Sequence, residues 1–84
     1  MHELPDEYLA DILVQAKKVV NVLGPENYNI LQNNGRLAHQ EVDHVHFHII
    51  PKPNKEEGLV IGWPSSKADI GKLSEYAKEL SQKL

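Results

Sequence analysis

The stretch that decides the fold of this 84-residue chain reads His44-Val45-His46-Phe47-His48-Ile49-Ile50. Histidine alternates with apolar residues at a period of two, and side chains two apart on a β-strand point to the same face. The pattern predicts a strand over residues 42–50. Its core face would carry Val45, Phe47 and Ile49, and its other face a row of three imidazoles spaced roughly 6.5–7 Å apart.

Three imidazoles in one row favour chemistry at phosphorus. A neutral imidazole is a competent nucleophile, and a neighbouring imidazole can stabilise charge or pass a proton. The middle residue, His46, is best placed to attack, because one neighbour can orient its ring while the other meets a phosphate. The plain alternative, three solvent-facing polar side chains on a half-buried strand, stays open at this point.

A metal site is the sharper alternative. Two histidines at i and i+2 on a strand can share one zinc or iron ion. All three cannot easily do so, because the outer pair would lie roughly 13 Å apart. The chain has no cysteine, and Glu41 and Asp43 are the carboxylates nearby. We therefore predict no bound metal and no other cofactor.

A long amphipathic helix is predicted over residues 4–23, where apolar residues recur at steps of three and four. Pro5 suits the first turn, and Asp6 and Glu7 are favourable at the positive end of the helix dipole. Gly24-Pro25 supplies a stop signal. Both ends of this helix are therefore marked in the sequence.

A shorter strand is predicted before the one that carries the three histidines. Residues 28–33 combine aromatic and β-branched side chains and are predicted to form a strand, which Asn34-Gly35 ends. Residues 36–41 are predicted to form a loop that leads to the triad. Pro51 and Pro53 should end the triad strand, because proline lacks the N–H group that a ladder needs.

The last part of the chain holds a third candidate strand and a second helix. Residues 59–61 form a short apolar run that could be a strand. Ser66 and Asp69 resemble an N-cap pair, after which a helical stripe continues over residues 70–84. Two helices with two or three short strands make an α+β fold.

Composition limits the classes of function. With 40% apolar and 25% charged residues, the chain fits one small globular domain with a thin core. A net charge of −3 and a pI near 5.9 give no basic surface for nucleic-acid backbones. No apolar run approaches membrane-spanning length, and the first residues lack a signal-peptide pattern. We expect a cytoplasmic or nuclear protein that binds neither nucleic acid nor membranes.

The residues around the triad resemble the histidine triad (HIT) proteins. The alternating histidine motif at residues 44–50 is the family pattern. Asn33 to Asp43, Pro51-Lys52 and Gly62-Trp63-Pro64 are similar to the Hint branch of that family, especially its fungal members, which act as adenosine 5'-monophosphoramidases. The resemblance covers essentially the whole chain.

This resemblance implies catalytic roles for the triad. His46 would be the nucleophile that forms a nucleotidyl-histidine intermediate. His48 would contact the α-phosphate and the leaving group, and His44 would orient the site. The substrate implied is AMP joined to an amine, or a related purine nucleotide. A non-catalytic nucleotide-binding or dimeric scaffold module is the alternative function.

The resemblance also implies a nucleotide-binding loop. Asn33 would contact phosphate or ribose, and His39, Gln40 and Glu41 belong to the segment that wraps the α-phosphate with backbone donors. Glu41 stands where many animal relatives have a serine that assists the leaving group, and His39 replaces a common glycine. An exposed loop histidine and a turn-forming Asn33-Asn34 pair are the simpler interpretations.

Family domains contain a five-stranded antiparallel sheet, so the resemblance implies a partial HIT domain over residues 1–84, without the N-terminal strands that form much of the base pocket. The long helix and the strand before the loop would form a homodimer interface. On the helix we place Ile12, Ala16 and Val19 at that interface, with residues 28–32 pairing across the two-fold axis. Trp63 resembles a C-terminal tryptophan that approaches the partner's site.

Overall fold

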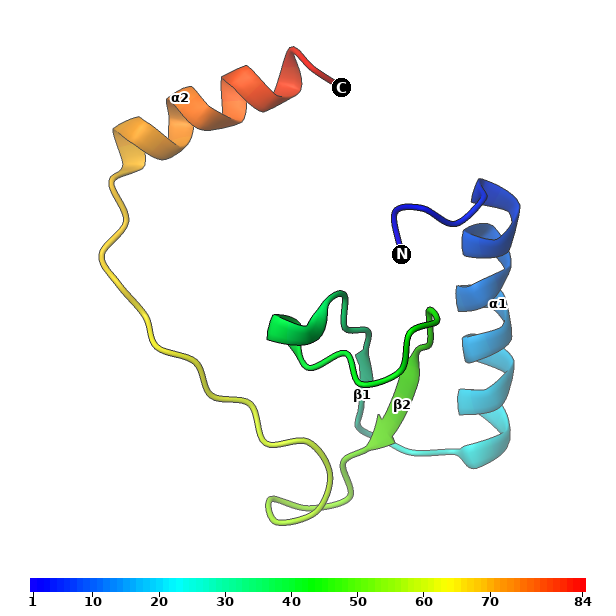
Figure 1. Cartoon of the computed structure of the whole chain (residues 1–84). Helices are drawn as coiled ribbons and strands as arrows, with labels where there is room; N and C mark the ends of the chain where they lie inside the picture. The colour runs from blue at the N-terminus through cyan, green and yellow to red at the C-terminus, as the bar shows by residue number, and fades with distance from the viewer.

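The computed structural model describes all 84 residues as two helices and one two-stranded antiparallel sheet, the expected α+β class. The elements in chain order are α1 (Asp6–Leu23), β1 (Tyr28–Leu31), the 3₁₀ helix η1 (Arg36–Ala38), β2 (His48–Pro51) and α2 (Ile70–Ser81). Figure 1 shows α1 beside the sheet, while α2 lies apart at the end of an extended segment. No helix combines the length and the apolar character needed to cross a membrane.

The ends of α1 follow the signals in the sequence. Pro5 precedes the helix, and Asp6 and Glu7 occupy its first turn. At the other end Gly24 adopts the left-handed conformation with φ 68°, and its N–H donates to the Val20 carbonyl at 2.8 Å. Glycine reaches this conformation without a Cβ penalty, so the helix ends where the sequence predicts.

The core of the molecule is very thin. The least exposed residues of α1 share one stripe at helical spacing: Leu9, Ile12, Ala16 and Val20. Ala16, 8% exposed, is the only buried residue in the chain. It lines a hollow of about 180 Å³ between the helix and β1, together with Tyr28 and Ile30. Helix and sheet therefore meet along a narrow contact.

The sheet pairs β1 with β2 in antiparallel register. Tyr28 lies opposite Pro51 and Leu31 opposite His48. The Lys52 N–H donates to the Asn27 carbonyl at 2.8 Å and extends the pairing past Pro51. Each strand has one edge without a partner.

The triad strand is shorter than predicted. It begins at His48, so residues 44–47 precede it and form no ladder. The cause lies in β1, which ends at Leu31 where a strand to residue 33 was predicted. The Gln32 amide donates to the Asn33 carbonyl at 3.2 Å and to Asn34 Oδ1 at 2.9 Å. These local hydrogen bonds turn residues 32–34 away from the direction of β1. Residues 44–47 therefore have no neighbouring strand with which to pair.

The predicted strand at residues 59–61 is also wrong. Gly58 bends the chain back with φ 85°, where an added Cβ would lie 2.5 Å from the Pro51 carbonyl oxygen. Residues 59–61 then face β1 across a hollow of about 620 Å³ that Trp63 also lines. No hydrogen bond crosses it, so apolar sequence alone does not make a strand here.

The helix α2 is capped by Asp69. Its carboxylate accepts the Lys72 N–H at 3.1 Å, whereas Ser66 lies three residues upstream of the cap and does not cap the helix. The helix ends at Ser81 instead of continuing to residue 84, and all of its residues are exposed. Its apolar stripe therefore packs against nothing in this chain.

We expect Asp69→Ala to lower the helicity of residues 70–81. Loss of an N-cap side chain costs about 1 kcal/mol, and a 12-residue helix without tertiary contacts is marginal in water. Backbone chemical shifts of the full chain measure the loss. Ser66→Ala is the matched control and should leave these shifts unchanged; an equal loss in both variants would contradict the assignment of the cap.

Candidate active site

The three triad imidazoles lie in a row at the start of β2. The ring centroids of His44 and His46 are 5.8 Å apart, and those of His46 and His48 are 4.8 Å apart. Both pairs meet edge to face, at 67° and 82°. The row predicted from the sequence therefore forms, although only His48 belongs to a strand.

A hydrogen bond fixes the middle ring. His46 Nδ1 lies 3.0 Å from the carbonyl oxygen of His44. A carbonyl oxygen can only accept, so Nδ1 carries the hydrogen and Nε2 of the neutral ring keeps its lone pair. His46 is half-buried, whereas the other two histidines of the row, His44 and His48, are exposed. The arrangement leaves Nε2 as the atom of the row prepared for nucleophilic attack.

The loop before the triad is closed by η1. His39 follows this turn in the left-handed conformation, with φ 65° and ψ 24°. A residue with a Cβ rarely adopts this region, whereas glycine does so freely. The Asn33 amide donates to the His39 carbonyl at 3.4 Å. The structure thus brings Asn33 to the loop and not into the histidine row.

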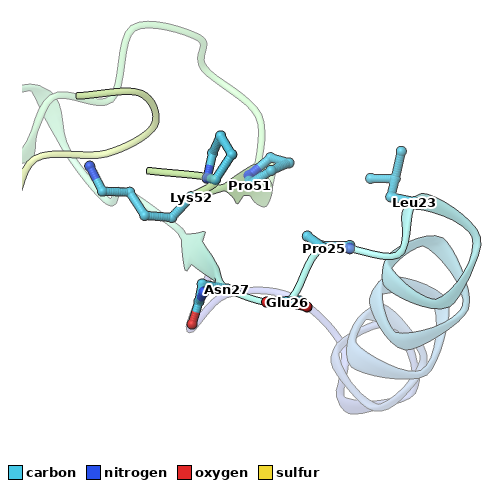
Figure 2. Close-up of a pocket in the computed structure, with 7 residues that line it drawn as sticks. Leu23, Pro25, Glu26, Asn27, Pro51 and Lys52 are labelled. Carbon is cyan, nitrogen blue, oxygen red and sulfur yellow. The ribbon is translucent and has the colours of Figure 1, made fainter. Parts of the chain in front are cut away.

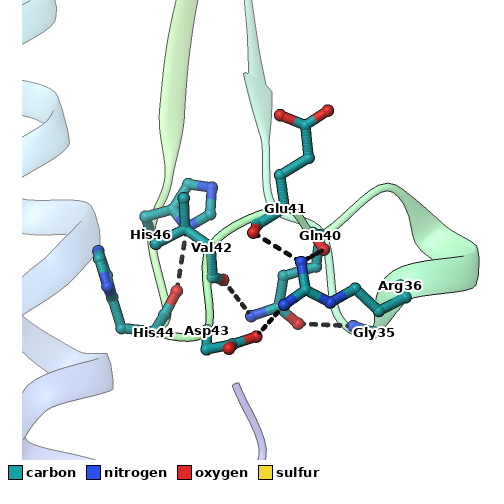
Figure 3. Close-up of polar contacts among 8 residues, drawn as sticks. All are labelled: Gly35, Arg36, Gln40, Glu41, Val42, Asp43, His44 and His46. Atoms are coloured by element: carbon teal, nitrogen blue, oxygen red, sulfur yellow. Dashed lines mark hydrogen bonds and ion pairs between the residues drawn. The ribbon is translucent and has the colours of Figure 1, made fainter.

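Gln40 supports the same loop with its side chain. Its Oε1 accepts the Gly35 N–H at 2.7 Å, and its Nε2 donates to the Val42 carbonyl at 2.9 Å. Both ends of the amide are therefore occupied within the chain. The Glu41 side chain is exposed and makes no hydrogen bond, and Figure 3 shows its carboxylate directed outward.

Arg36 is a site residue that was not predicted from the sequence, where it stands only at the start of a loop. The guanidinium of Arg36 bonds to the backbone of residues 40 and 41 and pairs with the Asp43 carboxylate (Figure 3). The available signal was a pair of opposite charges that brackets the loop and ends next to His44. The structure contains no group of three side chains arranged to hold a metal ion.

A prominent hollow lies away from the triad. It has a volume of about 420 Å³ and forms where the end of α1 approaches the end of β2 (Figure 2). Its lining residues are Leu23, Pro25, Glu26, Asn27, Pro51, Lys52 and Pro53. Because β2 runs from His48 to Pro51, this hollow is at the opposite end of the strand. It contributes nothing to the histidine row.

Comparison with known proteins agrees with this geometry. The family model of the HIT domain matches residues 1–55, which is more than half of the chain. The chain belongs to the HIT family. Its similarity to the family continues beyond that match, because adenosine 5'-monophosphoramidase of Schizosaccharomyces pombe is 61% identical over all 84 residues. The family predicted from the sequence is confirmed.

Other HIT relatives show how much of the domain the chain spans. The adenosine 5'-monophosphoramidase of Saccharomyces cerevisiae is 50% identical over 84 residues. The chain spans 63% of the first relative's length and 53% of the second's. The crystal structure of a histidine triad nucleotide-binding protein from Candida albicans matches with a TM-score of 0.88 and 47% identity, covering 99% of this chain and 64% of that one.

Proposed function

We propose that this chain carries the reacting centre of a nucleotide phosphoramidase that cleaves the bond between AMP and an amine. The observation that carries the proposal is the His46 Nδ1 contact with the His44 carbonyl, which frees Nε2 for attack. Two relatives of similar sequence are named adenosine 5'-monophosphoramidases. The 84 residues would act as part of one HIT domain with an AMP-type purine nucleotide as substrate.

The first step forms a bond between His46 Nε2 and the α-phosphorus. The phosphorus–nitrogen bond of the substrate breaks, and the amine leaves with a proton donated by a protonated His48. In the second step water attacks the phosphorus, its proton passes to His48, and the Nε2–phosphorus bond breaks to release AMP. His48 thus returns to its starting protonation state, and no redox partner is needed.

The loop offers donors for the phosphate charge. The backbone N–H groups of Glu41 and Val42 form no hydrogen bond within the chain. Unpaired amides beside a nucleophile can stabilise the charge that develops on phosphoryl oxygens. Gln40 would act through its backbone and by bracing the loop, because its side-chain amide is already engaged.

Nucleotidyl transfer to the protein tests the proposal directly. The full chain is mixed with adenosine 5'-phosphoramidate, quenched, and analysed by intact-mass and peptide mass spectrometry. We expect an adenylyl adduct on His46 and release of AMP over time. A chain that binds AMP but gives neither adduct nor product would favour the alternative, a non-catalytic nucleotide-binding or scaffold module.

The exposed apolar surface of α1 supports a homodimer. Of the residues expected at the interface from the sequence, Ile12 and Ala16 are among the least exposed of α1. Val19 and Val22 are instead exposed, and Val22 is 87% accessible. β1 also has one unpaired edge. We propose that the outward face of α1 and this edge form the two-fold contact.

We expect Val22→Asp to shift the chain toward monomer, because two like charges would be brought together in an apolar contact. Sedimentation equilibrium at micromolar concentration measures the change. Val60→Asp introduces the same charge at a comparably exposed valine, 77% accessible, outside α1 and should leave association unchanged. A wild-type chain that sediments as a folded monomer would refute the dimer.

A further inference from the structure

We propose that Arg36 is a positioning residue for the phosphate loop and the His46 nucleophile, an inference that rests on the function proposed above. Arg36 is the first residue of η1, and its guanidinium reaches forward over the loop. Nη1 donates to the Gln40 carbonyl at 3.1 Å and to the Glu41 carbonyl at 2.6 Å, while Nη2 donates to Asp43 Oδ1 at 2.6 Å. One planar cation therefore gathers three acceptors.

The contact is suited to orientation more than to stability. The side chains of Arg36 and Asp43 are 64% and 86% exposed. Ion pairs at such positions add little to the free energy of folding, because water screens them. A guanidinium with donors in a rigid fork nevertheless fixes the directions of the groups it binds.

The three hydrogen bonds of Arg36 to Gln40, Glu41 and Asp43 form a clasp. This clasp determines the direction in which the backbone N–H groups of the loop point. In a trans peptide the carbonyl and the following N–H point in opposite directions. When the Gln40 and Glu41 carbonyls turn toward the guanidinium, the N–H groups of Glu41 and Val42 turn away from it. Both lack partners in the chain. In Figure 3 the His44 and His46 rings lie on the far side of the loop from the guanidinium.

The clasp also reaches the nucleophile through the backbone. Asp43 directly precedes His44, whose carbonyl accepts from His46 Nδ1. Residues 44–47 have no ladder to hold them. The Arg36 contact with Asp43 therefore restrains the chain one residue before the carbonyl that selects the His46 tautomer.

Lysine at position 36 separates orientation from charge. Arg36→Lys keeps the positive charge and can still pair with Asp43, but a single nitrogen cannot span all three acceptors. Arg36→Ala removes charge and clasp together. Lys83→Ala is the matched control, because Lys83 is an exposed cation just beyond the end of α2 and pairs with Glu79 of that helix at 3.8 Å.

Long-range ¹H–¹⁵N spectra report the His46 tautomer without requiring turnover. We expect a hydrogen on Nδ1 in the wild type and in Lys83→Ala, and exchange between both tautomers in Arg36→Lys and Arg36→Ala. Titration with inorganic phosphate should shift the Glu41 and Val42 amides in the wild type. Both Arg36 variants should bind phosphate about tenfold more weakly, since misaligned donors lose much of their effect.

Each outcome decides the proposal. If Arg36→Lys matches the wild type in tautomer and phosphate affinity, Arg36 supplies only charge and the positioning role is wrong. The positioning role is also wrong if Arg36→Ala changes neither the His46 tautomer nor the phosphate affinity. Circular dichroism checks that each variant is folded. If Arg36→Ala unfolds, the result for Arg36→Lys decides the proposal. A normal tautomer response together with no adenylyl adduct on His46 would leave Arg36 as a positioning residue and reject the phosphoramidase.

Discussion

Replacement of His46 by alanine is expected to abolish turnover of adenosine 5'-phosphoramidate, with a fall of at least about 10³-fold. The reason is that Nε2 of this ring is the only triad nitrogen whose lone pair is set by a hydrogen bond on the opposite nitrogen. The fold should survive, because residue 46 takes no part in the β1–β2 ladder. Product formation and circular dichroism measure the two effects separately.

Two companion variants sharpen this result. His48→Ala removes a proton donor and should slow turnover by about 10²-fold, less than loss of the nucleophile. His46→Gly leaves space for free imidazole, which should restore part of the activity if the missing group is a nucleophilic ring. Wild-type turnover by His46→Ala would show that the nucleophile is assigned wrongly.

AMP is expected to bind this chain about a hundredfold more weakly than it binds the Candida albicans relative. The groups proposed to contact phosphate are present, but only Ala16 is buried in the whole chain, so these residues form no enclosed apolar slot for a base. Covering roughly 100 Å² of an adenine ring contributes about 2.5 kcal/mol, close to a hundredfold in Kd. Calorimetry with both proteins measures the difference.

Ribose 5-phosphate is the control ligand for this comparison. It lacks the base, so its affinity for the two proteins should agree within a few-fold if the phosphate site is shared. Equal AMP affinity would contradict the argument. It would indicate that the hollow beside Trp63, lined also by Ile30 and Ile61, already accommodates the base.

The sequence predicted correctly those elements whose bounds depend on neighbouring residues in the chain, such as the end of α1. Gly24 ends α1 because its own backbone can turn, and α1 is stabilised by hydrogen bonds within one segment. The three imidazoles also form the predicted row, although their ring centroids, 5.8 and 4.8 Å apart, lie closer together than strand spacing predicts. Strand length did not follow, because a strand needs a neighbour. Residues 44–47 and 59–61 have strand-like sequences but no partner with which to form a ladder.

The supporting contacts of the site were harder to predict than the triad. Contact of Asn33 and of the Gln40 backbone with the nucleotide stays a prediction, and in the structure the side chains of both residues brace the loop. Only the opposite charge of Asp43 marks Arg36 in the sequence, because its other two acceptors are the backbone carbonyls of Gln40 and Glu41. Such contacts depend on the curvature of a loop, which no pattern of residue types specifies.

Only His48 of the triad lies in the paired strands, opposite Leu31, whereas His44 and His46 come before them. One end of the histidine row is therefore anchored by main-chain bonding and the other by loop side chains. Backbone hydrogen bonds in a strand persist through most side-chain substitutions. A contact made by a side chain is lost when that one residue is substituted. Substitutions in the loop can thus change the orientation of the His46 ring, while strand pairing with Leu31 holds His48 in place.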